Sequence, residues 1–446
     1  MRVLKFGGTS VGSPQRMWEV ADLINDGQPK VVVLSAVSGT TNKLVRIGNA
    51  LHEGNRSEAA ALLDALREEY LAFIEDLLPA GFYQLRAKMV LDQQFGRIES
   101  LFDSPFTAKA EKIILAQGEL ISTQLFQLYL EHSAIPSRLI PAFEFMRLDA
   151  QGEPDMPFIR RAIAQTLDRY AGAPYFITQG YVCLNHEGEI DNLQRGGSDY
   201  TATLLGAALD AGEIQIWTDI DGLHNNDPRV VKDTYPVRKV SYREAAELAY
   251  FGAKILHPTC VIPAEQMDVP IRLKNTMAPQ APGTLISGQS SGRRISAIAA
   301  KDGITAIKIR SGRMLNAYGF LRRVFEVFEQ FRTPIDMIAT SEVAVSLTID
   351  NPAHLEDILR ELAPFGEVSC DSGQSIICIV GDQLNEKVGV ARDIFDALED
   401  IPIRMVSYGG SNNNVSVLVA GEYKNLALQA LQRVMLKLER AETVVS

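Results

Sequence analysis

The sequence predicts an α/β protein in which helices sandwich a mostly parallel sheet, followed by two smaller ferredoxin-like α+β domains. Over residues 1–290, short β-branched runs alternate with long helical patterns, which is typical of a parallel sheet covered on both faces. A polar, glycine-rich stretch over residues 287–294 interrupts this pattern, as a linker does. Beyond this stretch the chain contains a repeat: a segment that begins at Gly319 recurs in similar form at Gly389.

The expected strands of the larger domain are short and apolar, and each is bounded by Gly, Pro or Asp. They are Arg2–Phe6 and residues 30–35, 175–181, 214–219 and 271–273. Between residues 57 and 78, apolar side chains recur at three- and four-residue spacing, which predicts an amphipathic helix. We expect this apolar stripe to lie in the core rather than to line a ligand site.

The C-terminal third is a tandem repeat. Three pairs of similar segments carry it: residues 319–325 and 389–395, 334–338 and 402–406, and 343–347 and 414–418. Each unit reads as strand, helix, strand, strand, helix, strand, a ferredoxin-like order. The sequence therefore predicts a large domain over residues 1–290, a linker over 291–302, and two repeats over 303–380 and 381–446.

Composition and charge exclude several classes of partner. The 446 residues include 55 acidic and 44 basic side chains, a net charge of −11, so the chain lacks the positive footprint that binds nucleic acid or an anionic membrane. The apolar run over residues 31–37 is far shorter than the roughly 18 residues that span a bilayer. The N-terminus has no secretory pattern, and the four cysteines form no Cys-x-x-Cys pair. We therefore expect a soluble cytoplasmic protein.

Two glycine pairs are candidates for anion binding. Lys5 ends a predicted strand and is followed by Gly7 and Gly8, which predicts either a phosphate cradle or an ordinary tight turn. The spacing is not that of a P-loop. The second pair follows Arg195 and precedes a helical stretch with Ser198 or Asp199 as N-cap. It predicts anion binding at a helix start, or simple capping.

Two further segments carry polar residues next to apolar ones. Residues 217–229 leave a predicted strand and contain three aspartates and one arginine; they could bind a nucleotide or, at Asp219 and Asp221, form a turn. Residues 251–258 place Lys254 among apolar neighbours. Judged alone, Lys254 could be a surface lysine with a packed aliphatic stem.

Taken together, these segments resemble the signature segments of aspartate kinases, which belong to the amino acid kinase superfamily. The resemblance follows the same order along the chain, and the C-terminal tandem resembles the pair of ACT regulatory domains of the lysine-sensitive, monofunctional type. The matching segments are residues 5–11 (Lys-Phe-Gly-Gly-Thr-Ser-Val), 195–199 (Arg-Gly-Gly-Ser-Asp), 218–222 (Thr-Asp-Ile-Asp-Gly), 227–229 (Asp-Pro-Arg) and 251–258 (Phe-Gly-Ala-Lys-Ile-Leu-His-Pro).

The resemblance implies transfer of the γ-phosphoryl of MgATP to the side-chain carboxylate of L-aspartate, giving 4-phospho-L-aspartate and ADP. This is the first step of lysine, threonine and methionine biosynthesis. Because the carboxylate nucleophile is already ionised near neutral pH, the reaction needs cationic and amide groups rather than a general base. The alternatives are another phosphotransferase of the superfamily and a non-catalytic amino-acid sensor.

The resemblance also implies site residues. Lys5, Lys254 and Asp199 would be catalytic, with Asp199 holding the lysines in place. The resemblance assigns no protein side chain to the magnesium ion, which accompanies ATP. The remaining ATP contacts would be Gly7, Gly8, Thr9, Ser10, Thr218, Asp219, His224, Asp227 and Arg229, although many relatives have Tyr at the position of His224. The aspartate contacts would be Thr41, Glu119, Arg195, Gly196, Gly197 and Ser198.

The tandem resembles a lysine effector site, with threonine as the competing effector. A glycine-opened helix start would receive the effector carboxylate, and Asp336 or Glu342 its ammonium group. The candidate contacts are Met314, Ala317, Gly319, Phe320, Leu321, Asp336, Ser341, Glu342 and Val343. For Phe320, Leu321 and Val343, core packing is an equal alternative. We expect a homodimer through the ACT domains, with a tetramer of paired dimers as the alternative assembly.

Overall fold

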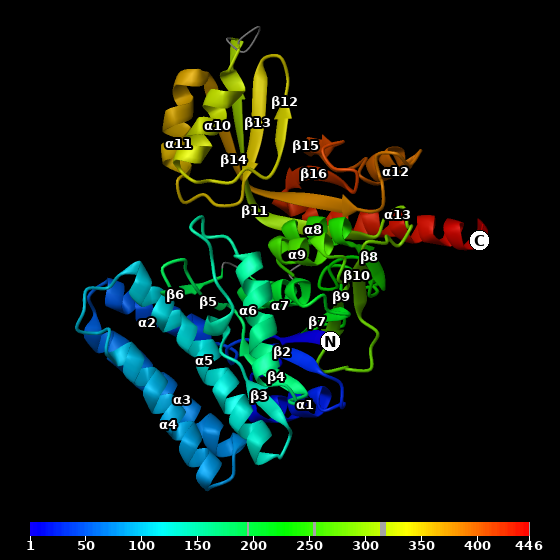
Figure 1. Cartoon of the computed structure of the whole chain (residues 1–446). Helices are drawn as coiled ribbons and strands as arrows, with labels where there is room; N and C mark the ends of the chain where they lie inside the picture. The colour runs from blue at the N-terminus through cyan, green and yellow to red at the C-terminus, as the bar shows by residue number, and fades with distance from the viewer. Residues whose placement is uncertain (194–195, 253–255, 313–317, 446) are drawn as a thin grey trace. The chain divides into compact units, whose positions relative to one another are not determined.

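A computed structural model describes residues 1–193, 196–252, 256–312 and 318–445, and for residues 439–445 only the backbone. The chain divides into two compact units (Figure 1). The first comprises Met1–Leu223 and Leu256–Gly288. The second comprises His224–Ile255 and Gln289–Ser446. The segment 224–255 therefore groups with the C-terminal part, although the sequence pattern assigns it to the larger domain; the expected domain limits stay a prediction.

The first unit is built on a sheet whose strands run in the order β3-β4-β2-β1-β7-β9-β10. Pairing is parallel from β3 to β9, and β10 is antiparallel to β9. These strands are β1 (Arg2–Phe6), β2 (Lys30–Leu34), β3 (Ser137–Leu139), β4 (Tyr175–Gln179), β7 (Glu213–Thr218), β9 (Ile271–Asn275) and β10 (Thr284–Ser287). A separate hairpin pairs β5 (Val182–Leu184) with β6 (Ile190–Asn192). Every residue of β2 and β4 is buried, as expected for parallel strands covered on both faces.

Helices flank this sheet. The helix predicted over residues 57–78 is α3, which Asn55 caps by accepting a hydrogen bond from the backbone N–H of Glu58. Its stripe of Leu63, Leu66, Tyr70 and Ile74 lies in the core with α2, α4 and α5. The helices are α1 (Pro14–Ile24), α2 (Thr40–His52), α3 (Arg56–Leu77), α4 (Phe82–Glu99), α5 (Ala108–His132), α6 (Met156–Arg169), α7 (Gly197–Ala208), α9 (Val261–Gln266), η1 (Ala142–Glu144) and η2 (Pro258–Cys260).

The second unit contains one six-stranded antiparallel sheet in the order β12-β13-β11-β14-β16-β15. Its strands are β11 (Ala297–Arg310), β12 (Ile338–Thr340), β13 (Ala344–Ile349), β14 (Glu367–Val380), β15 (Ile403–Tyr408) and β16 (Asn414–Ala420). The other elements are β8 (Lys239–Ser241), α8 (Tyr242–Tyr250), α10 (Phe320–Gln330), α11 (Leu355–Leu362), α12 (Val390–Ala397), α13 (Lys424–Val445), η4 (Ala363–Phe365) and η5 (Gly421–Tyr423). The predicted fold class is confirmed in both parts.

Two long strands, β11 and β14, run through both repeats. The sequence pattern predicts that each repeat supplies all six of its own elements. In the structure, residues 297–301 of β11 pair with residues 376–380 of β14, and both segments belong to the half of the sheet that the second repeat forms. The strand register shifts between Lys301 and Ile304. Near this shift, Gly303 and Gly373 adopt φ of +75° and +70°, a conformation that favours glycine. Each half of the six-stranded sheet has its own apolar core, one for each repeat.

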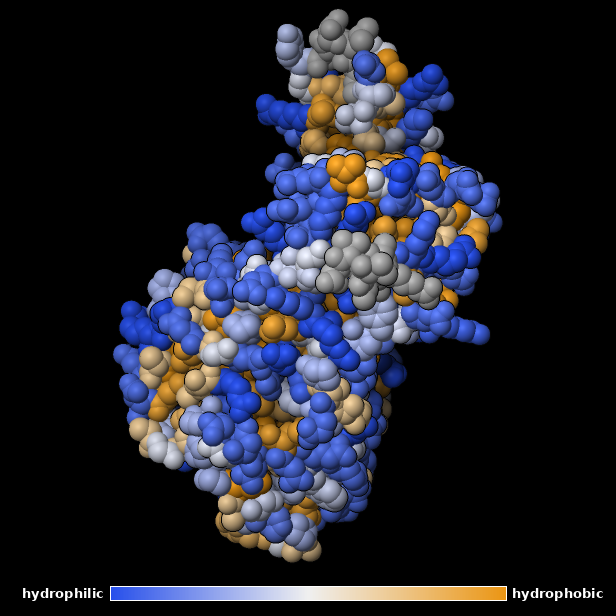
Figure 2. Space-filling view, turned by 90° about the vertical axis from the view of Figure 1, so that its right-hand side faces the viewer, coloured by the Kyte–Doolittle hydropathy of each residue, from blue (hydrophilic) through white to orange (hydrophobic). Residues whose placement is uncertain are grey.

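The surface carries no extended apolar band on the face shown in Figure 2, where hydrophilic residues predominate. None of the helices in the described ranges combines the length and the apolar character that crossing a bilayer requires.

Candidate functional site

The glycine loop after β1 is held against the neighbouring strands of the first unit. The Gly7 N–H donates to the carbonyl of Trp217 at 3.1 Å, and the Ser10 N–H donates to the carbonyl of Gly7 at 2.9 Å. The Ser10 hydroxyl lies 2.6 Å from that of Thr276. A Cβ on Gly8 would lie 3.0 Å from the Ala36 carbonyl oxygen. The loop therefore packs closely against the segment after β2, while Thr9 is exposed.

An ion pair joins this loop to the start of α7. The ammonium of Lys5 lies 2.7 Å from a carboxylate oxygen of Asp199, and their side chains are only 11% and 15% exposed. Asp199 stands in the first turn of α7, and the N-cap Gly196 has φ of +76°. A Cβ on Gly197 would lie 2.4 Å from the ring of Tyr181. The structure thus brings together two predicted catalytic residues from distant parts of the chain.

Glu119 on α5 is a buried carboxyl group next to the same region. One of its oxygens accepts a 3.2 Å hydrogen bond from the Ala36 N–H, and the other has no hydrogen-bond partner among the described residues. Burial raises the pKa of Glu119 to about 8, against the opposing hydrogen bond from Ala36 and the charge of Lys5. The site therefore holds a buried carboxyl oxygen without a partner among the described residues, and a cation close to it would favour the ionised form.

The remaining predicted aspartate contacts lie around these groups or fall outside the described residues. Thr41 is exposed in the first turn of α2. Ser198 approaches Gly180 so closely that a Cβ on that glycine would lie 2.5 Å from the Ser198 hydroxyl. Arg195 lies outside the described residues, as does Lys254, which was predicted to be catalytic and to bind ATP. The roles assigned to all of them stay predictions.

The predicted nucleotide motif is divided between the two units. Thr218 and Asp219 belong to the first unit, where the Thr218 hydroxyl donates to Asp219 at 3.0 Å. His224, Asp227 and Arg229 belong to the second. Arg229 donates to Asp227 from its backbone N–H, Nε and Nη2 at 2.8–2.9 Å, and these bonds hold the pKa of the Asp227 carboxyl below its usual value. The His224 ring lies 3.2 Å from the Thr234 hydroxyl.

The predicted effector contacts gather around α10 and β12. Gly319 is the N-cap of α10 with φ of +76°, and Phe320 is buried in the core beneath it. Leu321, Ser341, Glu342 and Val343 are exposed. Met314 and Ala317 lie outside the described residues.

Asp336 also has a buried side chain, and its partners were not predicted from the sequence. Its side chain is 1% exposed, and one oxygen receives the Lys301 ammonium at 2.7 Å and the Tyr250 hydroxyl at 2.9 Å. Its other oxygen has no hydrogen-bond partner among the described residues. No spacing pattern in the sequence connects Tyr250, Lys301 and Asp336, because Tyr250 ends α8, Lys301 lies in β11 and Asp336 lies in the segment before β12.

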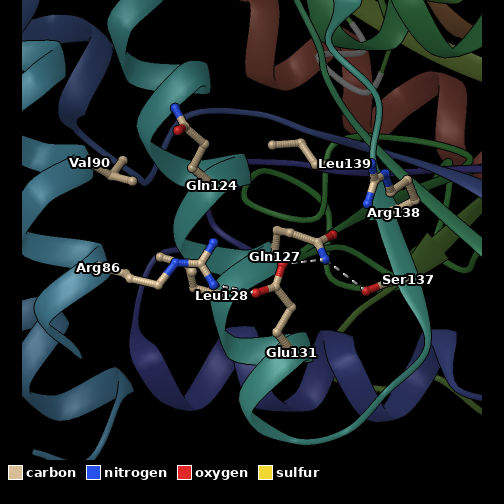
Figure 3. Close-up of a pocket in the computed structure, with 9 residues that line it drawn as sticks. All are labelled: Arg86, Val90, Gln124, Gln127, Leu128, Glu131, Ser137, Arg138 and Leu139. Atoms are coloured by element: carbon tan, nitrogen blue, oxygen red, sulfur yellow. Dashed lines mark hydrogen bonds and ion pairs between the residues drawn. The ribbon is translucent and has the colours of Figure 1, made fainter. Parts of the chain in front are cut away.

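A cavity of about 220 Å³ lies between α4, α5 and β3 (Figure 3). Several of its polar side chains pair with one another: Arg86 with Glu131 at 2.8 Å, and Gln127 with Ser137 at 3.3 Å. No predicted site residue lines it. Among the residues that the structure describes, no three His, Cys, Asp or Glu side chains lie together so that they could hold a metal ion.

Comparison with known proteins identifies the family. Residues 1–275 match the amino acid kinase family, and residues 377–435 match the ACT domain. The chain is 33% identical to lysine-sensitive aspartokinase 3 of Escherichia coli, over 96% of this chain and 98% of that protein.

Two solved structures of E. coli aspartokinase III have the same fold, each at 33% identity. The complex with aspartate and ADP, in the R-state, gives a TM-score of 0.85 and covers 98% of this chain and 100% of that one. The complex with lysine and aspartate, in the T-state, gives 0.82 and covers 98% and 99%. The resemblance seen in the sequence is confirmed, and the chain belongs to the aspartokinase family of amino acid kinases.

Proposed function

We propose that this chain transfers the γ-phosphoryl group of MgATP to the side-chain carboxylate of L-aspartate, giving 4-phospho-L-aspartate and ADP. The observation that carries the proposal is the Lys5–Asp199 ion pair, at 2.7 Å, beside the glycine loop after β1. The E. coli relative that matches this chain from end to end is an aspartokinase, and one of its structures contains aspartate and ADP.

Lys5 supplies positive charge to the phosphates. The reaction brings the anionic carboxylate of aspartate toward the anionic γ-phosphoryl group, so cations must offset their repulsion. Lys5 is held by Asp199, and we propose Lys254 as the second cation. Magnesium enters with the nucleotide, because Mg²⁺ is commonly bound by substrate phosphates and a few waters with only one or two carboxylates.

Glu119 binds the α-ammonium group of aspartate. Its free oxygen is buried, and a buried acceptor without a partner favours a ligand that donates. Arg195, with Gly196, Gly197, Ser198 and Thr41, then positions the carboxylates of the substrate. The guanidinium of arginine suits this because it can donate two parallel hydrogen bonds to a carboxylate.

The ACT repeats bind L-lysine and inhibit the enzyme. The relative is lysine-sensitive, its T-state structure contains lysine, and Asp336 offers a buried carboxylate oxygen without a partner. We propose a homodimer through the ACT domains as the regulated form, with pairing of dimers into tetramers as a further step.

Release of ADP with different acceptors tests the activity. We expect release with L-aspartate and far less with L-glutamate, N-acetylglutamate or carbamate, together with an acyl phosphate that hydroxylamine traps as the hydroxamate. Comparable release with another acceptor would contradict aspartate as the substrate. If none of these acceptors, including L-aspartate, gives ADP release, the proposed kinase activity is wrong.

A further inference from the structure

The carboxylate proposed to bind the effector already has an internal cation. Asp336 is 1% exposed, and the ammonium of Lys301 lies 2.7 Å from its Oδ1. The same ammonium lies 2.8 Å from Asp350, whose side chain is 39% exposed. Lys301 therefore bridges one buried and one partly exposed carboxylate.

Lys301 lies next to a register shift in β11. The register of β11 against β14 shifts directly after Lys301, and a bulge changes the direction in which neighbouring side chains point. The ammonium also lies 4.6 Å from the centre of the Tyr250 ring, and the Tyr250 hydroxyl donates to the Asp336 oxygen that Lys301 contacts. Burial opposes the charge of Lys301, but the hydrogen bonds with Asp336 and Asp350 raise the pKa of its ammonium group.

The charges in this cluster leave room for one more cation. Asp336 and Asp350 carry two negative charges and Lys301 carries one positive charge, so the cluster is one positive charge short of neutral. The Asp336 Oδ2 has no hydrogen-bond partner among the described residues. An incoming ammonium that binds Asp336 would repel Lys301, which could then remain paired with Asp350 alone.

We propose that Lys301 competes with the effector for Asp336, and that Asp350 weakens this competition by holding Lys301 when the effector binds. This inference rests on the proposed inhibition by L-lysine and concerns the same site. The proposed competition favours an effector with a positively charged side chain. Such a ligand pairs with Asp336 while Lys301 stays paired with Asp350, so that two ion pairs form. A ligand without net charge, such as threonine, adds no net positive charge to the cluster.

Tyr250 connects the cluster to α8. It is the last residue of that helix and precedes Lys254 by four positions in the sequence. At the other end of α8, Ser241 and Glu244 form a capping box that fixes the helix start. Effector binding that redistributes the bonds of Asp336 therefore acts on the C-terminal end of α8.

Calorimetric titration of the full-length protein with L-lysine tests the inference in two directions. Lys301→Met removes the competitor, so lysine should bind about tenfold more tightly. Asp350→Asn leaves Lys301 paired with Asp336 alone, so lysine should bind several-fold more weakly. Lys308→Met is the matched control, because Lys308 is an exposed lysine on the same strand, and it should bind lysine like the wild type.

The outcomes separate this inference from the proposed function. If the wild type binds lysine but Lys301→Met binds it no more tightly and Asp350→Asn no more weakly, the competition is wrong and lysine inhibition stands. If neither the wild type nor Lys301→Met binds lysine, both are wrong. Aspartate-dependent ADP release without lysine, measured on every variant, shows that each protein is folded; Asp350→Asn keeps the test decisive if Lys301→Met does not fold.

Discussion

Glu119 is the residue whose protonation is most relevant to substrate binding. Its pKa is raised to about 8, mainly by burial, so the carboxyl is largely neutral at pH 7 while the site is empty. A neutral carboxyl binds an ammonium group poorly, and binding must first remove its proton. Affinity for aspartate should therefore rise with pH until the carboxyl is ionised.

We predict that the KM for aspartate falls as the pH is raised toward 8, by up to about tenfold per pH unit. In Glu119→Gln the KM should be high and no longer follow this titration, since an amide does not ionise. Initial rates of ADP release over a pH series measure both. A wild-type KM that stays constant over this range would contradict the role of Glu119.

The site residues differ in how far the sequence could reveal them. Lys5 and Asp199 stand in recognisable glycine-rich segments, so both were expected, although only the fold shows that they form an ion pair. Glu119 was expected from its segment, but its free oxygen depends on the position of Ala36. Lys301 and Tyr250 have no local signal at all, because their role arises from contacts between residues that are far apart in the sequence.

At the scale of elements, α5 approaches the segment after β2 through a glycine. A Cβ on Gly118 would lie 2.8 Å from the Cβ of Ala36, and that methyl group is fixed to the backbone and cannot rotate away. Gly118 also precedes Glu119, which bonds to the Ala36 N–H. Close packing at Gly118 therefore positions the carboxyl group of Glu119.

We predict that Gly118→Ala destabilises the protein by about 1–3 kcal/mol, because it overpacks this contact, and raises the KM for aspartate. Gly96→Ala is the matched control within α4, where a Cβ would meet nothing within 4 Å. It should stabilise the protein by about 0.5–1 kcal/mol, since alanine is the better helix former. Thermal unfolding and ADP release measure the pair. Equal effects of the two substitutions would contradict the packing argument.

The strands show where a sequence pattern is informative and where it is not. Buried parallel strands such as β2 and β4 appear as continuous apolar runs, so they were predicted close to their observed bounds. The sharing of β11 and β14 between the repeats was not predicted, because a repeat in sequence does not specify which copy supplies each paired strand. The pairing of residues 297–301 depends on a partner about 80 positions away.

At the scale of the whole molecule, the chain passes between its two units within the predicted nucleotide motif. Residues 224–255 belong to the second unit, where Asn226 donates to the Leu428 carbonyl at 3.1 Å and to Gln432 at 3.2 Å. Asn226 in turn accepts a hydrogen bond from the Asp227 N–H. Nothing in the local sequence predicts this attachment to α13, which only a search for long-range partners could find.

We predict that Gln432→Ala raises the KM for ATP by roughly three- to tenfold and leaves the KM for aspartate nearly unchanged. The substitution leaves the buried amides of Asn225 and Asn226 with fewer partners, at a cost of about 1–3 kcal/mol, and so loosens the segment that carries Asp227 and Arg229. Arg433→Ala, an exposed neighbour on α13, is the control. An equal rise in both KM values would contradict a specific effect on nucleotide binding.

The most direct test concerns the charge that Lys5 provides next to Asp199. Aspartate-dependent ADP release by Lys5→Met should fall at least about 100-fold, as when a preorganised group that stabilises the transition state is lost, while Lys232→Met, an exposed lysine, keeps normal turnover. Circular dichroism and thermal unfolding establish that the variant is folded. A folded Lys5→Met enzyme with normal kcat would contradict the proposal that this lysine stabilises the transferred phosphoryl group.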